Sequence, residues 1–276
     1  MTVRIALFQS TTGIDPRANA QALVEAIAEA AEGGATMLFT PEMSGLLDRE
    51  GERAGANLAR EDEDPVLTRC REAAGDQNIW LHLGSLAVLA EGGKIANRAF
   101  VIAPDGEIRA RYDKMHLFDV DLATGESWRE SATYAAGGEA VVVDGTPVGK
   151  LGLTICYDVR FPGLFARLAE AGAEAIAVPA AFTVPTGEAH WHVLLRARAI
   201  EAGLFVIAAA QVGHHEDGRQ TYGHSLVVDP WGEVLLDMGE RVGVGFATID
   251  PARIGDVRSR VPALNHRRLI PEAVIL

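Results

Sequence analysis

Short apolar runs typical of β-strands alternate with helical patterns along most of this 276-residue chain. The expected strands cover residues 3–9, 36–42, 79–89, 97–114, 147–156, 173–182, 204–213, 223–239 and 242–250. The expected helices cover residues 16–34, 64–76, 163–172 and 188–203. Such alternation predicts an α/β fold. Because several strands follow one another without a helix between them, a mixed, two-layer arrangement is favoured over one parallel sheet.

Two strand–turn–strand segments resemble each other, "FVIAPDGEI" (100–108) and "LVVDPWGEV" (226–234). Both place Pro-x-Gly-Glu between apolar strands, which is typical of a hairpin. The similarity has two interpretations that stay open at this point, an internal duplication or the same turn chemistry used twice. Neither a Pro/Ser-rich linker nor a break in composition interrupts the chain, so we expect one domain over residues 1–276.

Charge and hydropathy argue against several classes of partner. The formal net charge is −13, and no basic cluster precedes the short "NHRR" at 265–268, so nucleic acid is not an expected partner. The longest apolar runs, such as 204–210, are far too short to cross a bilayer. The first residues resemble a strand more than a signal peptide. With only Cys70 and Cys156 present, we expect no disulfide framework and a cytoplasmic location.

Three reactive side chains follow predicted strands. Cys156 ends "LGLTIC", Glu42 follows "TMLFTP", and Lys114 follows "EIRARYD". Ligands of open α/β sheets gather at the carboxyl ends of strands, so these three side chains could converge on one crevice. Residues 115–138 show no sustained periodicity. Because connections this long are uncommon and tend to be functional, we expect an active-site loop there.

A thiol, a carboxylate and an ammonium group together suit covalent catalysis. A thiolate is the nucleophile, and a nearby carboxylate can accept the thiol proton and return it to a leaving amine. A fixed ammonium stabilises a developing oxyanion. A helix from Phe161 onward would favour the thiolate through its dipole. Taken singly, each residue has an ordinary interpretation: a buried cysteine, a surface lysine and a loop acid.

Two other motifs have simpler explanations than a functional site. The segment "GTPVGK" (145–150) is one residue short of a phosphate loop and lacks a Ser or Thr after Lys150, so we expect a strand and its turn. The segment "GHHEDG" contains His214, His215, Glu216 and Asp217. Adjacent histidines point apart, so a solvated loop is expected there in place of a metal site.

The remaining candidates concern single histidines and the second cysteine. His190 and His192 lie two residues apart on a predicted helix and so cannot share a face. His116 follows Lys114 closely and offers a Cys–His pair as a different mechanism. Cys70 lies within a helical pattern between two arginines, and we expect it to be structural.

Three segments together resemble the signature segments of the nitrilase superfamily of carbon–nitrogen hydrolases. They are "LFTPEMSG" (38–45), "YDKMHLFDVD" (112–121) and "GLTICYDVRFP" (152–162). By this resemblance Glu42 is the general base and acid, Lys114 holds the oxyanion, and Cys156 is the nucleophile. The backbone N–H of Tyr157 is the second oxyanion donor. The implied fold is a single-domain α-β-β-α sandwich that assembles as a homodimer or a higher homo-oligomer.

The superfamily has a further glutamate in the loop after the lysine. In "RESATYAAGG" this position is Glu130, and the downstream Gly137 fits the pattern. Glu126, which also lies in a Glu-Ser pair, is the competing choice. The resemblance implies no metal and no organic cofactor.

Within the superfamily, the segments 179–201 and 209–234 resemble the Nit branch. Its deaminated glutathione amidases cleave the ω-amide of an α-keto acid through a thioester. By this resemblance Arg160, Phe182 and Thr186 line the substrate pocket, and Arg160 could pair with the carboxylate of the keto acid or only tie loops together. The alternatives are an ω-amidase acting on 2-oxoglutaramate, a nitrilase or N-carbamoyl amino acid amidohydrolase, and a non-catalytic binding protein.

Overall fold

Two six-stranded sheets form the centre of the computed structural model, which describes residues 1–121, 125 and 127–275. The first sheet has the order β16-β1-β2-β3-β4-β5 and the second β15-β14-β11-β10-β9-β8. The first contains β1 (Val3–Gln9), β2 (Met37–Phe39), β3 (Trp80–Leu89), β4 (Ile95–Ile102), β5 (Ile108–Asp113) and β16 (Gly243–Ile249). The second contains β8 (Val142–Thr146), β9 (Gly149–Leu153), β10 (Ala175–Ala177), β11 (Phe205–Ala208), β14 (Leu226–Val228) and β15 (Val234–Asp237).

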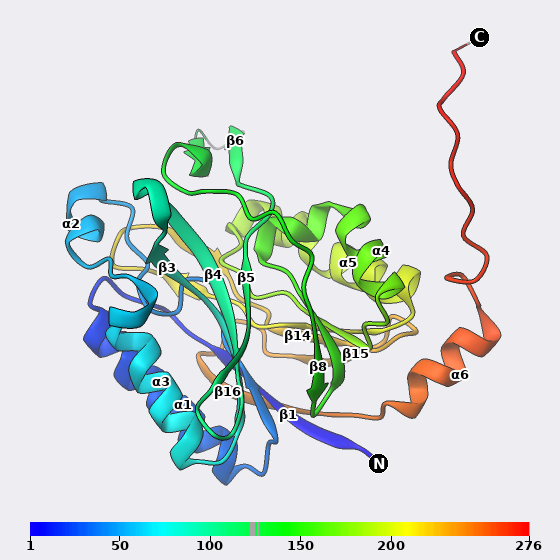
Figure 1. Ribbon diagram of the computed structural model, residues 1–276, viewed down its shortest axis with the longest axis horizontal. Helices are drawn as coiled ribbons and strands as arrows, with labels where there is room; N and C mark the ends of the chain where they lie inside the picture. Colours follow the sequence, from blue (N-terminus) through cyan, green and yellow to red (C-terminus); the bar gives the residue numbers. More distant parts are fainter. Residues whose placement is uncertain (122–124, 126, 276) are drawn as a thin grey trace.

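Helices cover the outer face of each sheet (Figure 1). Alternate side chains of a strand point to opposite faces, and both faces of the first sheet are buried by apolar contacts. Its outward residues, such as Ala6 and Leu38, form one apolar cluster with α1 (Pro16–Glu32) and α3 (Pro65–Asp76). Its inward residues, such as Ile5 and Met37, share a second cluster with the other sheet. That cluster also includes α4 (Pro162–Glu170) and α5 (Val184–Ala202). The expected α-β-β-α sandwich is therefore confirmed.

Local sequence signals explain where the two helices on the first sheet begin. The Asp15 carboxylate accepts a hydrogen bond of 2.9 Å from the N–H of Arg17, and Pro16 opens α1. The Asp64 carboxylate accepts from the N–H groups of Val66 and Leu67, each at 2.9 Å, at the start of α3. Such caps satisfy backbone donors that have no partner within the helix, and each stabilises by about 1 kcal/mol.

The two sheets have the same pairing pattern. In the first, β16 pairs antiparallel with β1, β1 to β3 are parallel, and β4 and β5 continue antiparallel. In the second, β8 pairs antiparallel with β9, β9 to β11 are parallel, and β14 and β15 continue antiparallel. The similar hairpins β4–β5 and β14–β15 thus occupy equivalent edges. Their placement supports internal duplication over a coincidence of turn chemistry.

Some expected strands are shorter or divided. The expected strand 147–156 ends at Leu153, and its start is the turn of the hairpin β8–β9, where Gly149 has a φ of 81°. Residues 204–213 divide into β11 and β12 (Val212–His214), because β12 leaves the sheet to pair with β13 (Gln220–Tyr222). Residues 115–138 contain a hairpin of β6 (Asp119–Asp121) and β7 (Ser127–Arg129).

Two short helices had no clear sequence signal. The helix α2 (Gly51–Ala56) buries no side chain, and α6 (Ala252–Arg260) buries only Ile254 and Val257. Neither therefore shows the apolar periodicity on which a prediction depends. The 3₁₀ turns are η1 (Glu61–Glu63), η2 (Glu91–Gly93), η3 (Glu130–Ala132) and η4 (Cys156–Arg160). Among the described residues, none of the helices has the length and apolar character that membrane crossing requires.

Candidate active site

Glu42 lies where strand ends from the two sheets meet. It follows β2 of the first sheet, and its side chain is buried. Its Oε2 accepts a hydrogen bond of 2.9 Å from the N–H of Ala181, which follows β10 of the second sheet. Its backbone carbonyl accepts from Gln211 Nε2 at 3.0 Å, beyond the end of β11. Contacts to both sheets therefore fix the direction of the Glu42 carboxylate.

Lys114 follows β5, and its ammonium group lies between two carboxylates. Its Nζ is 2.9 Å from Glu42 Oε1, and it is 2.9 Å and 3.1 Å from Glu130 Oε2 and Oε1. Burial opposes the charge on Lys114, but Glu130 and Glu42 outweigh it and raise the lysine pKa well above its ordinary value. Burial likewise opposes ionisation of Glu42, yet the Lys114 charge holds its pKa below the ordinary value. Lys114 and Glu42 are thus both charged near neutral pH.

Asn97 and the loop after Lys114 complete this arrangement. Asn97 Nδ2 lies 2.9 Å from Glu42 Oε1 and 3.3 Å from Glu130 Oε1, and the N–H of Phe118 donates to Glu130 Oε2 at 2.7 Å. Asn97 was missed from the sequence because it lies within β4 and nothing in "IANRAF" distinguishes it. Glu130, one of the two candidate glutamates, meets Lys114, whereas Glu126 lies outside the described residues.

Cys156 begins the turn η4, three residues after β9 ends. Its φ is 47°, in the left-handed region that few residues other than glycine adopt. Its N–H donates to Pro179 O at 2.9 Å, and that of Asp158 donates to Ile155 O at 3.0 Å. Between them, the N–H of Tyr157 donates to no backbone carbonyl in the part of the chain that the structure describes. This donor is available to a ligand beside the thiol.

The Cys156 thiol is protonated at neutral pH. Burial and the adjacent charge of Glu42 raise the cysteine pKa well above its ordinary value, against the opposing effect of Lys114. The expected helix after Phe161 is present as α4, which begins at Pro162. The expectation that its dipole favours the thiolate stays a prediction, while burial and the Glu42 charge act against the thiolate in the resting site. The carboxylate of Glu42 is positioned to accept the proton during reaction.

These groups line one cavity of about 370 Å³. Its walls include Glu42, Asn97, Lys114, Glu130, Cys156 and Tyr157. The segment 115–138 contributes several more lining residues, which agrees with its expected place at the site: Phe118, Trp128, Arg129, Thr133 and Tyr134. Aromatic and aliphatic side chains make up much of the remaining wall. Such a cavity encloses a small molecule and leaves polar groups at one end to orient it.

Of the three residues expected in the substrate pocket, Phe182 and Thr186 line the cavity and Arg160 does not. The guanidinium of Arg160 lies 5.2 Å from the centre of the Phe182 ring, and its Nη1 is 3.2 Å from His190 Nδ1. Arg160 therefore contacts Phe182 of the cavity wall and His190 of α5, although it is not among the residues that line the cavity. Its role in binding the substrate stays a prediction.

Three other arginines line the cavity and were not predicted, because their segments carry no signal that relates them: Arg49, Arg129 and Arg219. Arg129 pairs with Asp121 at 2.8 Å, and Arg219 pairs with Asp217 at 2.6 Å. Arg49 Nε donates to the carbonyl oxygen of Asp217 at 2.7 Å. Aspartates thus neutralise two of these arginines, and the cavity wall contains both basic and acidic side chains.

The other sequence candidates have structural roles. His116 Nδ1 lies 2.7 Å from Asp158 Oδ1, and its ring stacks on Phe161 outside the cavity, so it does not pair with Cys156. His215 is buried and contacts Thr12 O and Thr221 Oγ1, at 2.9 and 2.8 Å. The predicted solvated loop thus has one buried member, whereas His214 and Glu216 of the same segment are exposed. Cys70 is fully buried in α3, and burial raises its pKa to about 12.

Comparison with known proteins identifies the family. The family model described as Carbon-nitrogen hydrolase matches residues 4–259. The chain belongs to the carbon–nitrogen hydrolase family. This carbon–nitrogen hydrolase is 39% identical over 273 residues to a deaminated glutathione amidase of Yersinia enterocolitica, covering 98% of the chain and 94% of the relative.

Two solved structures extend the comparison. The NitFhit protein of C. elegans superposes with a TM-score of 0.89 and 41% identity. That match covers 97% of the chain, which spans 65% of the NitFhit chain. A mutant of the amidase from Nesterenkonia sp. AN1 superposes with a TM-score of 0.80 and 28% identity, covering 96% and 94% of the two chains. That structure shows covalent addition of the acetamide moiety of fluoroacetamide at the active-site cysteine.

Proposed function

We propose that this carbon–nitrogen hydrolase is a cysteine-dependent amidase acting on the ω-amide of a small α-keto acid, deaminated glutathione or a similar compound. The observation that carries the proposal is the position of Lys114 between Glu42 and Glu130, 2.9 Å from each, in the cavity that Cys156 also lines. A buried ammonium with two carboxylate partners is positioned to stabilise negative charge beside a nucleophile.

The first half of the reaction forms a thioester. Cys156 Sγ bonds to the amide carbon while Glu42 accepts the thiol proton. The carbonyl oxygen becomes an oxyanion, which the Lys114 ammonium and the Tyr157 N–H stabilise. The C–N bond then breaks, and Glu42 gives its proton to the departing nitrogen. Amine or ammonia leaves, and the acyl group remains on Cys156.

The second half releases the acid. Glu42 accepts a proton from water as the water oxygen bonds to the thioester carbon, and Lys114 and Tyr157 again hold the oxyanion. The C–S bond breaks, and the sulfur recovers the proton. Glu130 acts through Lys114 as a positioning residue. No step of this scheme requires an electron donor or acceptor.

The presence of arginines in the cavity wall supports an anionic substrate. Deaminated glutathione carries one carboxylate beside its keto group and another at its glycine end, and guanidinium groups bind carboxylates well. Arg49 and Arg219 lie on the side of the cavity formed by the connections after β2 and β12. The similarity to deaminated glutathione amidases supports the same substrate class.

Product release from a panel of amides tests the proposal. Deaminated glutathione, 2-oxoglutaramate, glutamine, asparagine, a simple nitrile and an N-carbamoyl amino acid are each offered to the purified chain. We expect the anionic keto-acid amides to be cleaved fastest. Preference for 2-oxoglutaramate would identify an ω-amidase, whereas turnover of only the nitrile or carbamoyl compound would contradict the proposed substrate.

Cys156→Ala is the control for the mechanism. We expect turnover to fall by about 10⁴-fold or more, because the nucleophile is lost. The fold should be retained, since Ala is smaller and apolar. Equal activity in this variant would contradict the mechanism, and absence of turnover in both forms would indicate a binding protein on the same fold.

We further propose that the chain is one domain over residues 1–276 and assembles as a homodimer or higher homo-oligomer. Val193 and Ile200 share a face of α5 and are 68% and 51% exposed. Exposed apolar faces of this kind favour association, which light scattering on the purified chain would check. The free Cys70 and Cys156 support a cytoplasmic location, which fractionation of expressing cells would check.

A further inference from the structure

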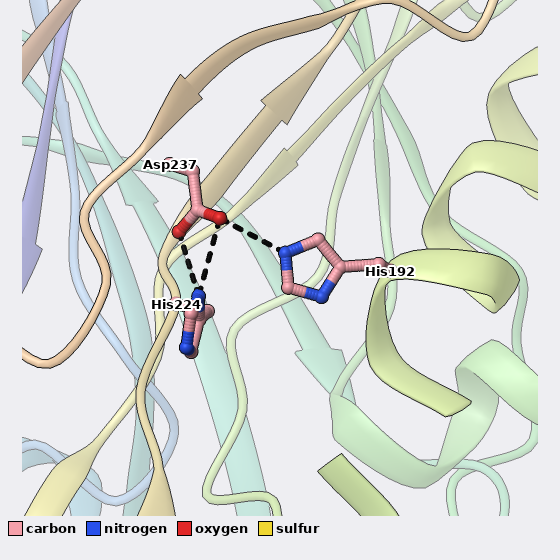
Figure 2. Close-up of side chains that lie close together, drawn as sticks. All are labelled: His192, His224 and Asp237. Carbon is pink, nitrogen blue, oxygen red and sulfur yellow. Dashed lines mark hydrogen bonds and ion pairs between the residues drawn. The ribbon is translucent and has the colours of Figure 1, made fainter. Parts of the chain in front are cut away.

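A second group of potential ligands lies outside the catalytic cavity. His192 comes from α5, His224 from the connection between β13 and β14, and Asp237 from the end of β15 (Figure 2). His192 Nε2 lies 2.9 Å from Asp237 Oδ2. His224 Nδ1 lies 2.8 Å from Asp237 Oδ1 and 3.1 Å from Oδ2. Two imidazole nitrogens therefore point at one carboxylate.

The backbone holds His224 in an uncommon conformation that directs its ring toward Asp237. Its φ is 55°, in the left-handed region. Its N–H donates to Gly239 O at 2.7 Å, and its carbonyl accepts from Trp191 Nε1 at 2.8 Å. The ring of Tyr222 stacks on the imidazole with centroids 4.5 Å apart. Strained residues fixed by several partners occur preferentially at functional sites.

Asp237 is also held by a neighbour. Its Oδ1 accepts a hydrogen bond of 2.9 Å from the N–H of Gly239, so one backbone donor orients the carboxylate. Partners that orient the ligands from behind are typical of metal sites. The side chains of His192, His224 and Asp237 are 34%, 24% and 33% exposed. They are therefore accessible to an ion and leave space for water as a further ligand.

The geometry and charge of the cluster suit zinc. One ligand atom from each residue lies within 4.8 Å of the others. Zinc bonds of about 2.0–2.1 Å in a tetrahedral site place ligand atoms about 3.3 Å apart, which is close to the 2.9 and 2.8 Å between each imidazole nitrogen and its nearest Asp237 oxygen. Two imidazoles and one carboxylate are ligand types that Zn²⁺ binds in proteins.

We propose that His192 Nε2, His224 Nδ1 and the Asp237 carboxylate form a divalent transition-metal site that binds Zn²⁺, with water completing the coordination. Each imidazole is then neutral and carries its proton on the nitrogen that faces away from the ion. The ion joins α5 to β15 and to the connection before β14. It is a structural ion, remote from the bond-breaking steps at Cys156.

The site is connected to the cavity wall through α5. Trp191, next to His192, donates to the carbonyl of His224 and packs on Phe182 with ring centroids 4.8 Å apart. Phe182 lines the cavity. A bound ion therefore stabilises the middle of α5 (Val184–Ala202), which supports this wall, and we expect Zn²⁺ to raise the thermal midpoint of unfolding.

The test measures Zn²⁺ uptake by untagged chain in the Cys156→Ala background, which removes the catalytic thiol as a competing ligand. Equilibrium dialysis followed by metal analysis should find one Zn²⁺ per chain. Co²⁺ as a second probe should give the visible absorption of a tetrahedral site with nitrogen and oxygen ligands. Adding His192→Ala or Asp237→Asn should abolish both, and neither variant should gain thermal stability from Zn²⁺.

His214→Ala is the matched control, because His214 is an exposed histidine on β12 outside the cluster. This variant should still bind one Zn²⁺ per chain, and Zn²⁺ should still raise its thermal midpoint of unfolding. Circular dichroism confirms that each variant is folded, and alanine at position 192 suits a helix. No stoichiometric uptake, or equal uptake in the control and in both cluster variants, would overturn the proposal.

Discussion

The hydroxyl of Tyr112 donates a hydrogen bond of 2.7 Å to Asp158 Oδ2 and so joins the strand before Lys114 to the turn that carries Cys156. Asp158 is fully buried. It also accepts from the N–H of Ile155 at 2.8 Å and from the N–H of His116 at 3.0 Å. Burial and the Asp158 charge raise the pKa of Tyr112, so the hydroxyl keeps its proton and remains a donor.

Tyr112→Phe should impair catalysis as well as stability. It removes one hydrogen bond to a charged group, which should lower the free energy of unfolding by about 1.5–3 kcal/mol. Because Lys114 and Cys156 then lose a shared support, kcat should fall between about 10- and 100-fold. Steady-state kinetics and urea unfolding measure the two effects. A loss of stability with unchanged kcat would show that the bond has no part in positioning the site.

Lys114→Met should leave the carboxylates of Glu42 and Glu130 buried without their cation. We expect a loss of about 3–5 kcal/mol in unfolding free energy and of about 10²–10³-fold in kcat. The double variant Lys114→Met/Glu130→Gln replaces one of the two buried carboxylates with a neutral amide, so stability should recover in part while kcat stays low. Recovery of activity in the double variant would contradict the role given to Lys114.

Glu42→Gln should make Cys156 easier to ionise. The Glu42 charge is second only to burial in raising the thiol pKa, so its removal should lower that pKa. Ultraviolet thiolate absorbance, corrected with Cys156→Ala, measures this directly. The variant should nonetheless turn over slowly because no base remains to accept the proton. An unchanged or higher thiol pKa would refute this reading of the electrostatics.

His82 should make the fold sensitive to acid. Burial lowers its pKa to about 3, and neither ring nitrogen has a hydrogen-bond partner among the described residues. A group whose folded pKa is depressed contributes stability above its unfolded pKa of about 6.5 and loses it as pH falls. Between pH 7 and pH 5, His82 alone should therefore cost about 2 kcal/mol of unfolding free energy.

His82→Leu tests this contribution. The variant should lose about 2 kcal/mol less stability than the native chain between pH 7 and pH 5, measured by urea unfolding at each pH. At pH 7 it should be at least as stable, because a buried polar group without a partner is removed. Parallel pH profiles for the two proteins would show that His82 does not titrate as described.

Much of the fold was predictable because its signals are local. Asp15 and Asp64 cap the helices that the sequence places after them, and the apolar periodicities of α1 and β1 show which faces are buried. The hairpin turns at 103–107 and 229–233 contain the residues that such turns require. Elements with little buried apolar surface, such as α2, were not predicted because they show no apolar periodicity.

The sequence by itself determined the alternation of strands and helices and the position of Glu42, Lys114 and Cys156 after predicted strands, and the resemblance of three motifs to a known family implied the sandwich and the roles of these residues. Only the tertiary structure decided that Asn97 lies between two carboxylates and that His192 meets Asp237. These contacts depend on how two sheets and their helices pack together. Separations of 33 to 55 residues leave no local trace in the sequence.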